Sequence, residues 1–501
     1  MTNLSILIAI PLISTLVGSL LGKRGTAAFA VLGALVTLGF AISIAVDYDT
    51  AKGGAQFAVD QVWIAPLGVH WALAIDGLNL ALVVLTAFVY SCVAIACALR
   101  NWDNPGLFFV WLGLGASSVL GAFLAQDLLL FILFFDLMLI PFYFLTGQWG
   151  GRDRVPATTK LVIYTLAGSL LMLAAGVAAG AMTASETGRP IDFLISNLAD
   201  HPLSKGTQQW LFLCFAAAML VKMPAFPLHG WLKDGYRAMP LPVLAIFSGV
   251  LSKVAAYGLL KLVLPIFPSA AASFQTLMLV IGLASIIYAS VLAFTTDDAR
   301  LVVAYSSVAQ LGFILIGIFS LTDDGAQGAL LQMVNHGLVT VPLVLILGLL
   351  AARSKGSERL SSMGGIAVGA PVLAVVFLIA ALANLAMPGS ANFIGEFLVL
   401  RGVFGSTVVI AVIACLGVVL AAVYMLRMYI RAMHGPNDNG CEEREIGWME
   451  ALPIVPAILL VLALAVSPQP LLNRSESAAQ ASVAKAAAAA DQNPVAHEAS
   501  R

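Results

Sequence analysis

Residues 209–232 read QWLFLCFAAAMLVKMPAFPLHGWL. The run is long and apolar enough to cross a bilayer, which takes about 20 residues, yet it contains Lys222, Pro224 and Pro227. Proline lacks an amide donor and clashes with the preceding turn, so the helix must open there. A charge at this depth costs at least ~2.5 kcal/mol and normally faces a protein partner or water. The stretch therefore predicts a broken membrane helix with a buried lysine.

The composition of the whole chain is that of a membrane protein. Of its 501 residues, 60% are hydrophobic and 10% are charged, whereas a soluble domain carries about 25% charged residues. The formal net charge of −1 shows no bias toward nucleic acid. Four of the five cysteines lie in apolar runs, and the only close pair, Cys92 and Cys97, has the wrong spacing for a metal site. We therefore expect no metal, iron–sulfur or haem site.

Apolar runs of about 20 residues predict one continuous all-α bundle of about fourteen spans. The first run is followed rather than preceded by basic residues, which is the reverse of a signal peptide, so we expect it to be retained as a membrane helix. The predicted spans are residues 4–21, 27–46, 77–98, 107–124, 128–145, 160–182, 209–232, 241–264, 274–294, 301–321, 328–350, 370–403, 408–428 and 451–467.

Lys and Arg gather in every odd-numbered joint between these spans. Because such residues mark the cytoplasmic side of a membrane, we expect the odd joints to face the cytoplasm. Both termini would then face the periplasm of a bacterial inner membrane. The basic joint residues are Lys23, Arg24, Arg100, Arg152, Arg154, Lys160, Lys233, Arg237, Arg300, Arg353, Lys355, Arg359, Arg427, Arg431 and Arg444.

The break in the seventh span has a counterpart in the twelfth, where Pro388 and Gly389 should open the helix. Paired breaks in two halves are typical of inverted-repeat transporters. We expect two five-helix repeats, the second inverted because five is odd. The Ala-rich tail has no apolar face to bury and is expected to be disordered or to form a frayed surface helix. The predicted units are residues 1–106 (spans one to three), 107–264 (first repeat), 274–428 (second repeat), 429–473 (last joint and helix) and 474–501 (tail).

Five ionisable residues lie at membrane depth in five different spans: Asp136, Lys222, Lys253, His336 and Glu396. One Asp–Lys pair alone would also fit a structural ion pair that pins two helices together. Five such groups are what a proton relay requires, because protons pass between them through intervening water. Polar neighbours at similar depth either order that water or bridge helices. These neighbours are Tyr305, Ser306, Ser307, Gln310 and Asn335.

The sequence around these residues resembles the M subunits of respiratory complex I, the proton-pumping NADH:quinone oxidoreductase. The resemblance runs from about residue 70 to residue 430. The related L subunits carry Lys in the twelfth helix, so Glu396 favours the M type. The matching segments are residues 76–79 (DGLN), 221–232 (VKMPAFPLHGWL), 304–308 (AYSSV), 332–337 (QMVNHG) and 392–398 (NFIGEFL).

The resemblance implies a proton-translocating membrane subunit that is driven by quinone reduction in other subunits. It implies that Asp136 modulates Lys222, since a nearby carboxylate favours the charged ammonium. Lys253 and His336 would carry the proton laterally, and Glu396 would be the gate toward the far side. The implied partners are L- and N-type and small membrane subunits. NADH, FMN, iron–sulfur clusters and quinone are expected in partner subunits, with no cofactor or redox centre in this chain.

Two positions depart from the family pattern. Asp136 stands where Glu is usual, so either the helices approach more closely or the contact to Lys222 is looser or water-bridged. Gln310 stands where His is common, and its amide orders water but cannot carry a proton. His229, near the end of the broken seventh span, fits either a structural hydrogen bond or a place in proton entry.

Two other classes of membrane protein have the same buried ionisable residues and broken helices. One is the ion-translocating subunit of a multi-subunit Na⁺/H⁺ antiporter, which has no redox partner, and Glu396 counts against it. The other is the corresponding subunit of a membrane-bound hydrogenase. A non-transporting scaffold would not need the buried charges.

Overall fold

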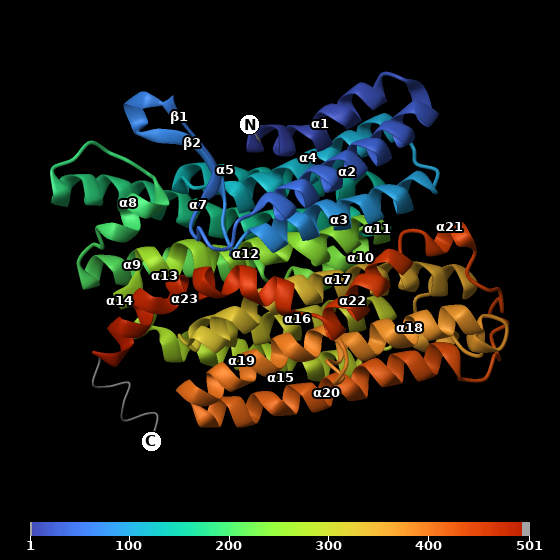
Figure 1. Cartoon of the computed structure of the whole chain (residues 1–501). Helices are drawn as coiled ribbons and strands as arrows, with labels where there is room; N and C mark the ends of the chain where they lie inside the picture. Colours follow the sequence, from blue (N-terminus) through green and yellow to red (C-terminus); the bar gives the residue numbers. More distant parts are fainter. Residues whose placement is uncertain (1–2, 493–501) are drawn as a thin grey trace.

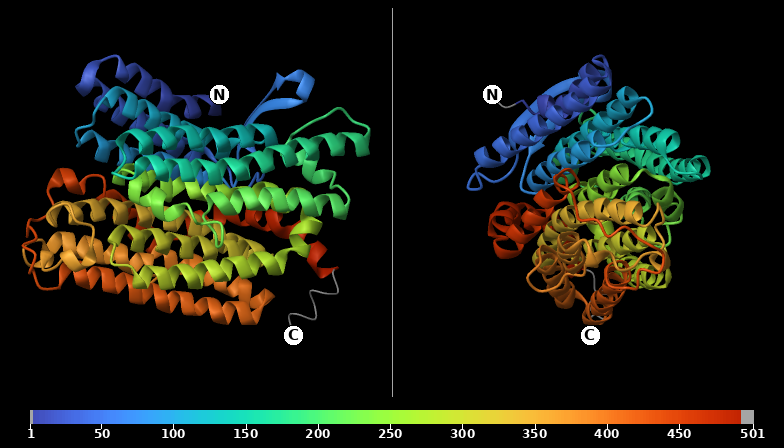
Figure 2. Two further views of the ribbon diagram at one scale, coloured as in Figure 1. Left: turned by 180° about the vertical axis from the view of Figure 1, so that it is seen from behind. Right: turned by 90° about the vertical axis from the view of Figure 1, so that its right-hand side faces the viewer.

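The computed structural model describes residues 3–492 as one bundle of long, roughly parallel helices (Figure 1). The N-terminal helices (blue) lie along one side of the bundle and residues 371–433 (orange) along the opposite side, while the C-terminal helices (red) cross the face between them (Figure 1, Figure 2). The predicted all-α membrane fold is confirmed, with one small hairpin added. The elements are α1 (Leu4–Ser19), α2 (Gly22–Asp47), β1 (Gln56–Ile64), η1 (Ala65–Leu67), β2 (Val69–Ile75), α3 (Leu80–Ala98), α4 (Pro105–Leu124), α5 (Leu128–Leu137), α6 (Leu139–Trp149), α7 (Arg154–Thr187), α8 (Ile195–Asp200), α9 (Lys205–Lys222), α10 (Leu232–Ala238), α11 (Leu241–Ile246), η2 (Phe247–Leu251), α12 (Ser252–Gly258), η3 (Leu259–Val263), α13 (Leu264–Ile266), α14 (Pro268–Ser273), α15 (Gln275–Thr295), α16 (Ala299–Phe319), α17 (Asp323–Arg353), η4 (Leu360–Ser362), η5 (Ile366–Val368), α18 (Pro371–Asn384), α19 (Ala391–Ser406), α20 (Val408–Met433), α21 (Trp448–Ala451), α22 (Val455–Val466) and α23 (Gln469–Asp491).

The described chain has 10 helical stretches that are long and apolar enough to cross a membrane, or 11 if the bent pair α22–α23 counts as one span. These 10 match predicted spans. The remaining predicted spans correspond to α1, α9, α18–α19 and α22, which are short, broken or bent. The count of about fourteen is therefore not confirmed, because hydropathy alone treats short and broken helices as full spans.

The hairpin β1–β2 was not predicted. It is an antiparallel pair between α2 and α3, and it projects from one end of the bundle (Figure 1). Strand β2 is hydrogen-bonded to the residues just before α5. The backbone amide of Gln126 donates to the carbonyl of Ala72 (2.8 Å), and the backbone amide of His70 donates to Asp127 Oδ2 (3.0 Å). We call this end of the bundle the hairpin end. We call the opposite end, which carries Arg300 and Arg353, the basic end.

Both predicted breaks are confirmed. The seventh span stops as a helix at Lys222, turns through residues 223–231 and resumes as α10, and the twelfth stops at Asn384 and resumes as α19 at Ala391. In the first break the carbonyl of Val221 is bonded by the indole of Trp231 (3.0 Å). This follows the rule that backbone groups freed at membrane depth must find partners inside the protein.

A backbone motif that occurs twice supports the inverted repeat. Asp127 caps α5 and Asp298 caps α16, each accepting from a backbone amide in the first turn (3.0 and 3.2 Å). Each also forms a short antiparallel bridge with the chain that follows the next long helix, at Leu194 and at Arg359. Asp127 lies at the hairpin end, whereas Asp298 lies at the basic end, where it pairs with Arg237 (2.9 Å). Equivalent caps at opposite ends are what two oppositely inserted copies require.

Both forms expected of the tail, disorder and a frayed surface helix, are wrong for residues 474–491, which form a packed helix. They belong to α23, which packs against α13, α14 and α17. Ala479, Val483 and Ala486 recur at helical spacing and are buried, so the tail has a narrow face of small residues that lets two helices approach closely. The last predicted tail residues, 493–501, lie outside the described residues.

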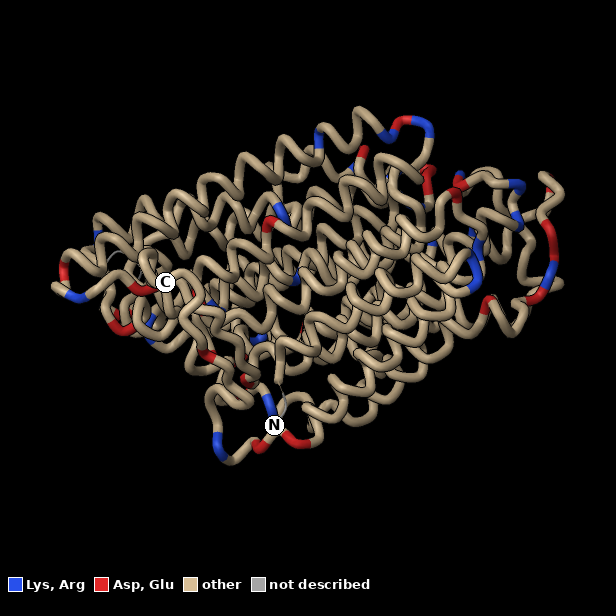
Figure 3. Tube along the Cα trace, turned by 90° about the horizontal axis from the view of Figure 1, so that it is seen from above, with Lys and Arg blue, Asp and Glu red and all other residues tan. Residues whose placement is uncertain are grey.

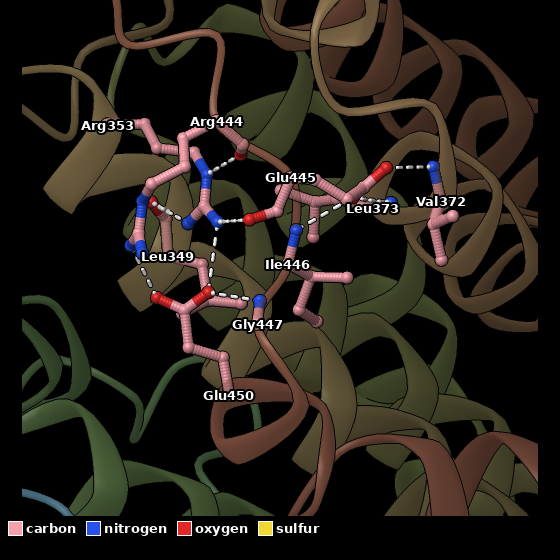
Figure 4. A network of polar contacts seen from close by, with 9 residues as sticks. All are labelled: Leu349, Arg353, Val372, Leu373, Arg444, Glu445, Ile446, Gly447 and Glu450. Carbon is pink, nitrogen blue, oxygen red and sulfur yellow. Dashed lines mark hydrogen bonds and ion pairs between the residues drawn. The ribbon is translucent and has the colours of Figure 1, made fainter.

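Charged residues gather at the two ends of the bundle, and only a few lie between them (Figure 3). At the basic end, Arg353 ends α17 and is 1% exposed. Its guanidinium donates to Glu450 Oε2 (3.0 Å) and to the carbonyl of Arg444 (2.8 Å) (Figure 4). Arg444 in turn donates to Glu450 Oε1 (2.7 Å). These hydrogen bonds and ion pairs hold the loop before α21 against the end of α17.

The same loop caps the twelfth span. The carboxylate of Glu445 accepts from the backbone amides of Val372 (2.7 Å) and Leu373 (2.9 Å) in the first turn of α18 (Figure 4). Amides in the first turn lack partners within the helix, and the helix dipole favours a negative charge there. This network thus fixes one end of the broken span whose other half carries Glu396.

A pH dependence of stability follows from this cap. Although burial raises it, the backbone amides of Ile446, Val372 and Leu373 hold the pKa of Glu445 below its usual range. A carboxyl with a lowered pKa contributes stability that is present above its unfolded pKa of about 4.3 and is lost as pH falls through the folded value. We expect Glu445→Gln to lower unfolding stability by about 1 kcal/mol at pH 7, and the difference from wild type to vanish in acid.

Thermal unfolding of the detergent-solubilised protein between pH 7 and pH 3.5 measures this difference. The exposed neighbour Glu442 offers a control, because Glu442→Gln leaves the cap intact. A difference between Glu445→Gln and wild type that stays constant down to pH 3.5 would contradict the charged cap.

Candidate functional site

The first part of the site lies where α5 and α9 end. Lys222 is 3% exposed, its ammonium donates to the carbonyl of Phe135, and Nζ lies 3.5 Å from the centroid of that ring. An aromatic face attracts a cation in this geometry. Asp136 is half-buried, and its Oδ1 has no hydrogen-bond partner among the described residues. No direct ion pair joins Asp136 and Lys222 among the described residues, so the closer approach that the shorter carboxylate left open is absent.

A small cavity continues from Lys222 toward the eighth span. Its volume is about 10 Å³, and its lining includes Thr165 of α7, Trp231 of the break and Leu251 of η2. That space is close to the least that holds one water molecule. The cavity therefore borders both Lys222 and η2, the segment that directly precedes the helix of Lys253.

Lys253 lies in α12, between two π-helical segments, η2 and η3, and is fully buried. Its Nζ donates to the carbonyl of Ser248 (2.5 Å) and to Oγ of Ser252 (3.3 Å). A π-helical bulge shifts the backbone register, and such bulges are frequent at functional sites. Here the bulge η2 turns the Ser248 carbonyl toward the ammonium, while Ser248 Oγ lies 3.2 Å from Ser307 Oγ of α16.

Glu396 lies in α19, just beyond the second break, and is 3% exposed. Its Oε1 accepts from Nε2 of Gln310 (2.7 Å) and of Gln332 (3.4 Å). Gln332 Nε2 also donates to Oε1 of Gln310 (2.6 Å). Gln310 therefore orients the carboxylate, and its Nε2 reaches the carbonyl of Asn384 as well (3.2 Å), at the edge of the break.

Helix α16 connects Lys253 with Glu396. Asn384 Nδ2 donates to Ser306 Oγ (2.7 Å), which also accepts from Tyr424 (3.3 Å). Ser306 and Ser307 are consecutive, so one helix touches both groups of contacts. We call this set the central corridor; its members are Lys253, Ser248, Ser307, Ser306, Asn384, Gln310 and Glu396.

His336 lies beside this corridor on α17. It is fully buried, and neither ring nitrogen has a hydrogen-bond partner among the described residues. A Cβ added to the next residue, Gly337, would lie 2.7 Å from the carbonyl oxygen of Gly249 in η2, so only a glycine permits this approach of α17. Asn335 donates to the carbonyl of Ala391 (2.7 Å) at the start of α19. Thus α17 bridges the eighth span and the second break.

Besides Asp136, Lys222, Asn335 and His336, two further sequence-predicted residues lie outside the corridor, His229 and Tyr305. His229 sits in the first break, with its ring centroid 5.2 Å from that of Tyr288, and its Nδ1 has no partner among the described residues. Tyr305 is buried on α16 immediately before the two serines.

Sequence reasoning missed Ser248, Gln332, Asn384 and Tyr424. Gln332 stands four residues before His336, and that spacing places both on one face of a helix. The sequence could therefore have identified Gln332 as a neighbour of the site. Asn384 contacts Ser306 and Gln310 only because the twelfth span breaks at this residue, and the Ser248 carbonyl reaches Lys253 only because η2 is π-helical. Neither contact could be inferred from the sequence pattern. Within residues 3–492, no three His, Cys, Asp or Glu side chains are grouped closely enough to hold a metal ion.

Comparison with known proteins gives consistent matches over most of the chain. The family model described as NADH:quinone oxidoreductase/Mrp antiporter, TM matches residues 125–422. The chain is 35% identical to NADH-quinone oxidoreductase subunit M of Rickettsia prowazekii, over 94% of this chain and 96% of the relative. It is 36% identical to subunit M of Escherichia coli (strain K12), over 89% of this chain and 91% of the relative.

Solved structures give the same result for the fold. A chain of respiratory complex I from Thermus thermophilus with bound NADH superimposes with a TM-score of 0.87 at 29% identity, covering 96% of this chain and 99% of that chain. A chain of the Mrp complex from Dietzia sp. DQ12-45-1b has a TM-score of 0.83 at 22% identity, covering 97% and 98%. At that identity the second match shows the shared fold alone.

Proposed function

The chain belongs to the NADH:quinone oxidoreductase/Mrp antiporter transmembrane family, and from this premise we propose that it is the proton-translocating M-type membrane subunit of an NADH:quinone oxidoreductase. The curated relatives above carry that subunit's name. This favours the complex I assignment over the antiporter and hydrogenase alternatives.

The observation that carries the proposal is the central corridor. Lys253 and Glu396 are both buried and lie on different spans. Contacts of 2.5–3.2 Å lead from Lys253 through Ser248 to Ser307, and from Glu396 through Gln310 and Asn384 to Ser306, so the two sets end at consecutive residues of α16. Buried ionisable groups are costly at this depth and are retained where protons or ions move. A purely structural ion pair would place opposite charges in contact, but neither Lys253 nor Glu396 has an oppositely charged partner among the described residues.

Lys222 is the loading site in this proposal. Its ammonium is held by a carbonyl and an aromatic ring rather than by a carboxylate, so movement of Asp136 toward it would favour the charged form and withdrawal would favour the neutral amine. A proton released from Lys222 would pass to Lys253, with His336 beside it. Glu396 would receive the proton at the end of the corridor.

We further propose that the repeats have the limits 107–264 and 274–428, and that the basic end faces the cytoplasm, with both termini on the periplasmic side of a bacterial inner membrane. The distribution of Lys and Arg supports this orientation. Neighbouring antiporter-like and small membrane subunits would be the partners. NADH, flavin, iron–sulfur clusters and quinone would bind in other subunits and supply the driving reaction.

Purification of the native complex under mild detergent, followed by mass identification of its subunits, tests this function. We expect NADH- and quinone-reactive subunits to copurify with this chain, and NADH oxidation by the complex in vesicles to acidify the hairpin-end compartment. Copurification with Na⁺/H⁺ antiporter or nickel hydrogenase subunits instead would overturn the assignment.

A further inference from the structure

An apolar groove runs along one side of α17, where α3, α22 and α23 meet this helix. Helix α17 packs against α3 and against the bent pair α22–α23, so α17 is the floor of the groove and the other helices are its walls. Val334 and Leu338 lie in the floor, and the groove has a volume of about 250 Å³. Its lining is apolar apart from Arg474 and Ser475 of α23. None of the roles proposed above uses this groove.

The groove is open on the side that faces the bilayer. Ala81, Val84 and Phe88 of α3 recur at helical spacing in one wall, and each of them is half-buried. In the opposite wall, Leu460 of α22 is 39% exposed. These side chains belong to apolar membrane segments, where an exposed side chain contacts hydrocarbon rather than water. The groove therefore admits molecules from the bilayer.

The depth of the groove matches one leaflet of the bilayer. Leu80 and Phe88 mark its length along α3, and eight residues of helix rise ~12 Å. The hydrocarbon core of a bilayer is about 30 Å thick, so each leaflet contributes about 15 Å. Helix α3 begins at the hairpin end (Figure 1), and the groove therefore extends from that boundary most of the way to the midplane. An acyl chain of a lipid in the same leaflet has this direction and this reach.

Arg474 lies at the end of the groove nearest the hairpin. A Cβ added to Gly77 would lie 2.5 Å from the carbonyl oxygen of Arg474, so Arg474 is level with the turn that precedes α3. The preceding residue, Asp76, pairs with Lys261 (2.6 Å) at the same level. The hydroxyl of Ser475 is occupied within its own helix, because it donates to the carbonyl of Leu471 (2.9 Å). A cation therefore stands at the membrane boundary, directly above an apolar groove.

The guanidinium of Arg474 makes no hydrogen bond or ion pair with the described residues, although the side chain is half-buried. A cation at the edge of the hydrocarbon normally finds an anionic partner or water. The phosphates of lipid headgroups lie at this boundary, and a guanidinium binds phosphate through two parallel hydrogen bonds. The charge of Arg474 and the apolar groove below it are thus complementary to the two parts of a phospholipid.

We propose that this groove binds one phospholipid of the leaflet at the hairpin end, with an acyl chain along α17 and the phosphate on Arg474. The site lies apart from the proton path and goes beyond the proposed function. The chain contacts Val334 and Leu338, which lie on the face of α17 opposite His336, because two residues turn a helix by ~200°. The bound lipid therefore supports from behind the helix that bridges the eighth span and the second break.

Photolabelling of the assembled enzyme in phosphatidylethanolamine vesicles tests the site. The probe is phosphatidylglycerol with a diazirine midway along one acyl chain, added in increasing amounts. Light expels N₂ from the diazirine, and the resulting carbene inserts into the nearest side chain, which mass spectrometry of the peptides identifies. We expect labels on Val84, Phe88 or Leu464, all of which line the groove, and we expect this labelling to saturate. Labelling that rises in proportion to the probe would be that of bulk lipid and would overturn the site.

Variants of Arg474 test the contact to the phosphate. At low probe, Arg474→Gln should lower labelling of the groove by about 10-fold, the factor that one charge-assisted hydrogen bond supplies. Arg474→Lys keeps the charge but not the two parallel hydrogen bonds, so it should retain part of the labelling. Arg189→Gln is the matched control, because Arg189 is an exposed arginine in the loop after α7 at the same end of the bundle. Equal labelling in Arg474→Gln and Arg189→Gln would contradict the role of Arg474.

A phosphate-free probe gives the same test without a substitution. Diacylglycerol with the same diazirine chain should label the groove of the wild-type enzyme about 10-fold less than the phosphatidylglycerol probe at equal, low amounts. Equal labelling by the two probes would overturn recognition of the phosphate. No labelling of the groove by either probe would mean that a neighbouring subunit fills it, and would overturn the lipid site. Since none of these measurements depends on proton transfer, the lipid site can fail while the proposed function stands.

Discussion

Lys222→Met is expected to abolish proton transfer through this subunit, slowing the step by about 100-fold or more, without preventing assembly of the enzyme. Methionine fills a similar volume and keeps the apolar stem of the side chain packed. It removes the ammonium that donates to the Phe135 carbonyl and lies over the Phe135 ring. Since Lys222 is the only titratable group at the first break with less than a tenth of its surface exposed, no neighbour among the described residues can take its place.

The measurement is the initial rate of proton uptake or release in sealed vesicles, normalised to NADH oxidation. Lys205→Met is the matched control, because Lys205 begins the same helix, α9, and is exposed. It should pump like wild type. Unimpaired pumping by Lys222→Met at a normal electron-transfer rate would remove Lys222 from the pathway.

Glu396→Gln is expected to have an effect of similar size at the other end of the corridor. Glutamine has nearly the same shape, and its Oε1 still accepts from Gln310 and Gln332, so the hydrogen bonds that orient the side chain survive. What the variant loses is the ability to take up and release a proton. Because Gln310 and Gln332 are amides as well, no adjacent side chain in this group of contacts replaces the lost carboxyl.

Glu396→Asp separates proton carrying from geometry. It keeps the carboxyl but withdraws it by one methylene, so we expect it to pump more than Glu396→Gln and less than wild type. The exposed Glu186 of α7 provides the control Glu186→Gln. Equal, wild-type pumping by Glu396→Gln would show that the proton does not pass through this residue.

Much of the site was visible in the sequence because its signals are local. Lys222 and Pro224 stand two residues apart inside an apolar run, so the buried charge and the broken helix could be inferred together. Asp136, Lys253 and Glu396 likewise stood out against apolar neighbours. The structure places Lys253 and Glu396 in one corridor, but that corridor depends on which residues of α16 face each of them. Ser307 faces the Lys253 side, whereas Ser306 and Gln310 face the Glu396 side.

The remaining features depend on long-range contacts that composition does not encode. The Ser248 carbonyl reaches Lys253 only because η2 is π-helical. The hairpin is held by Asp127, which is distant in sequence. Helix α23 exists because its small residues find a surface on α13, α14 and α17; alone, a helix of such low hydrophobicity would not be stable in water. The partnership of Asp76 with Lys261 spans 185 residues.

The central claim is that Lys222 and Glu396 serve one continuous proton path. The double variant Lys222→Met, Glu396→Gln tests it most directly, through the proton-to-electron ratio of the assembled enzyme in sealed vesicles. Groups that act in series are not additive, since either loss alone stops the path, so the double variant should show the same ratio as each single variant. A ratio that falls by the sum of the two single losses would mean two independent routes and would contradict the account.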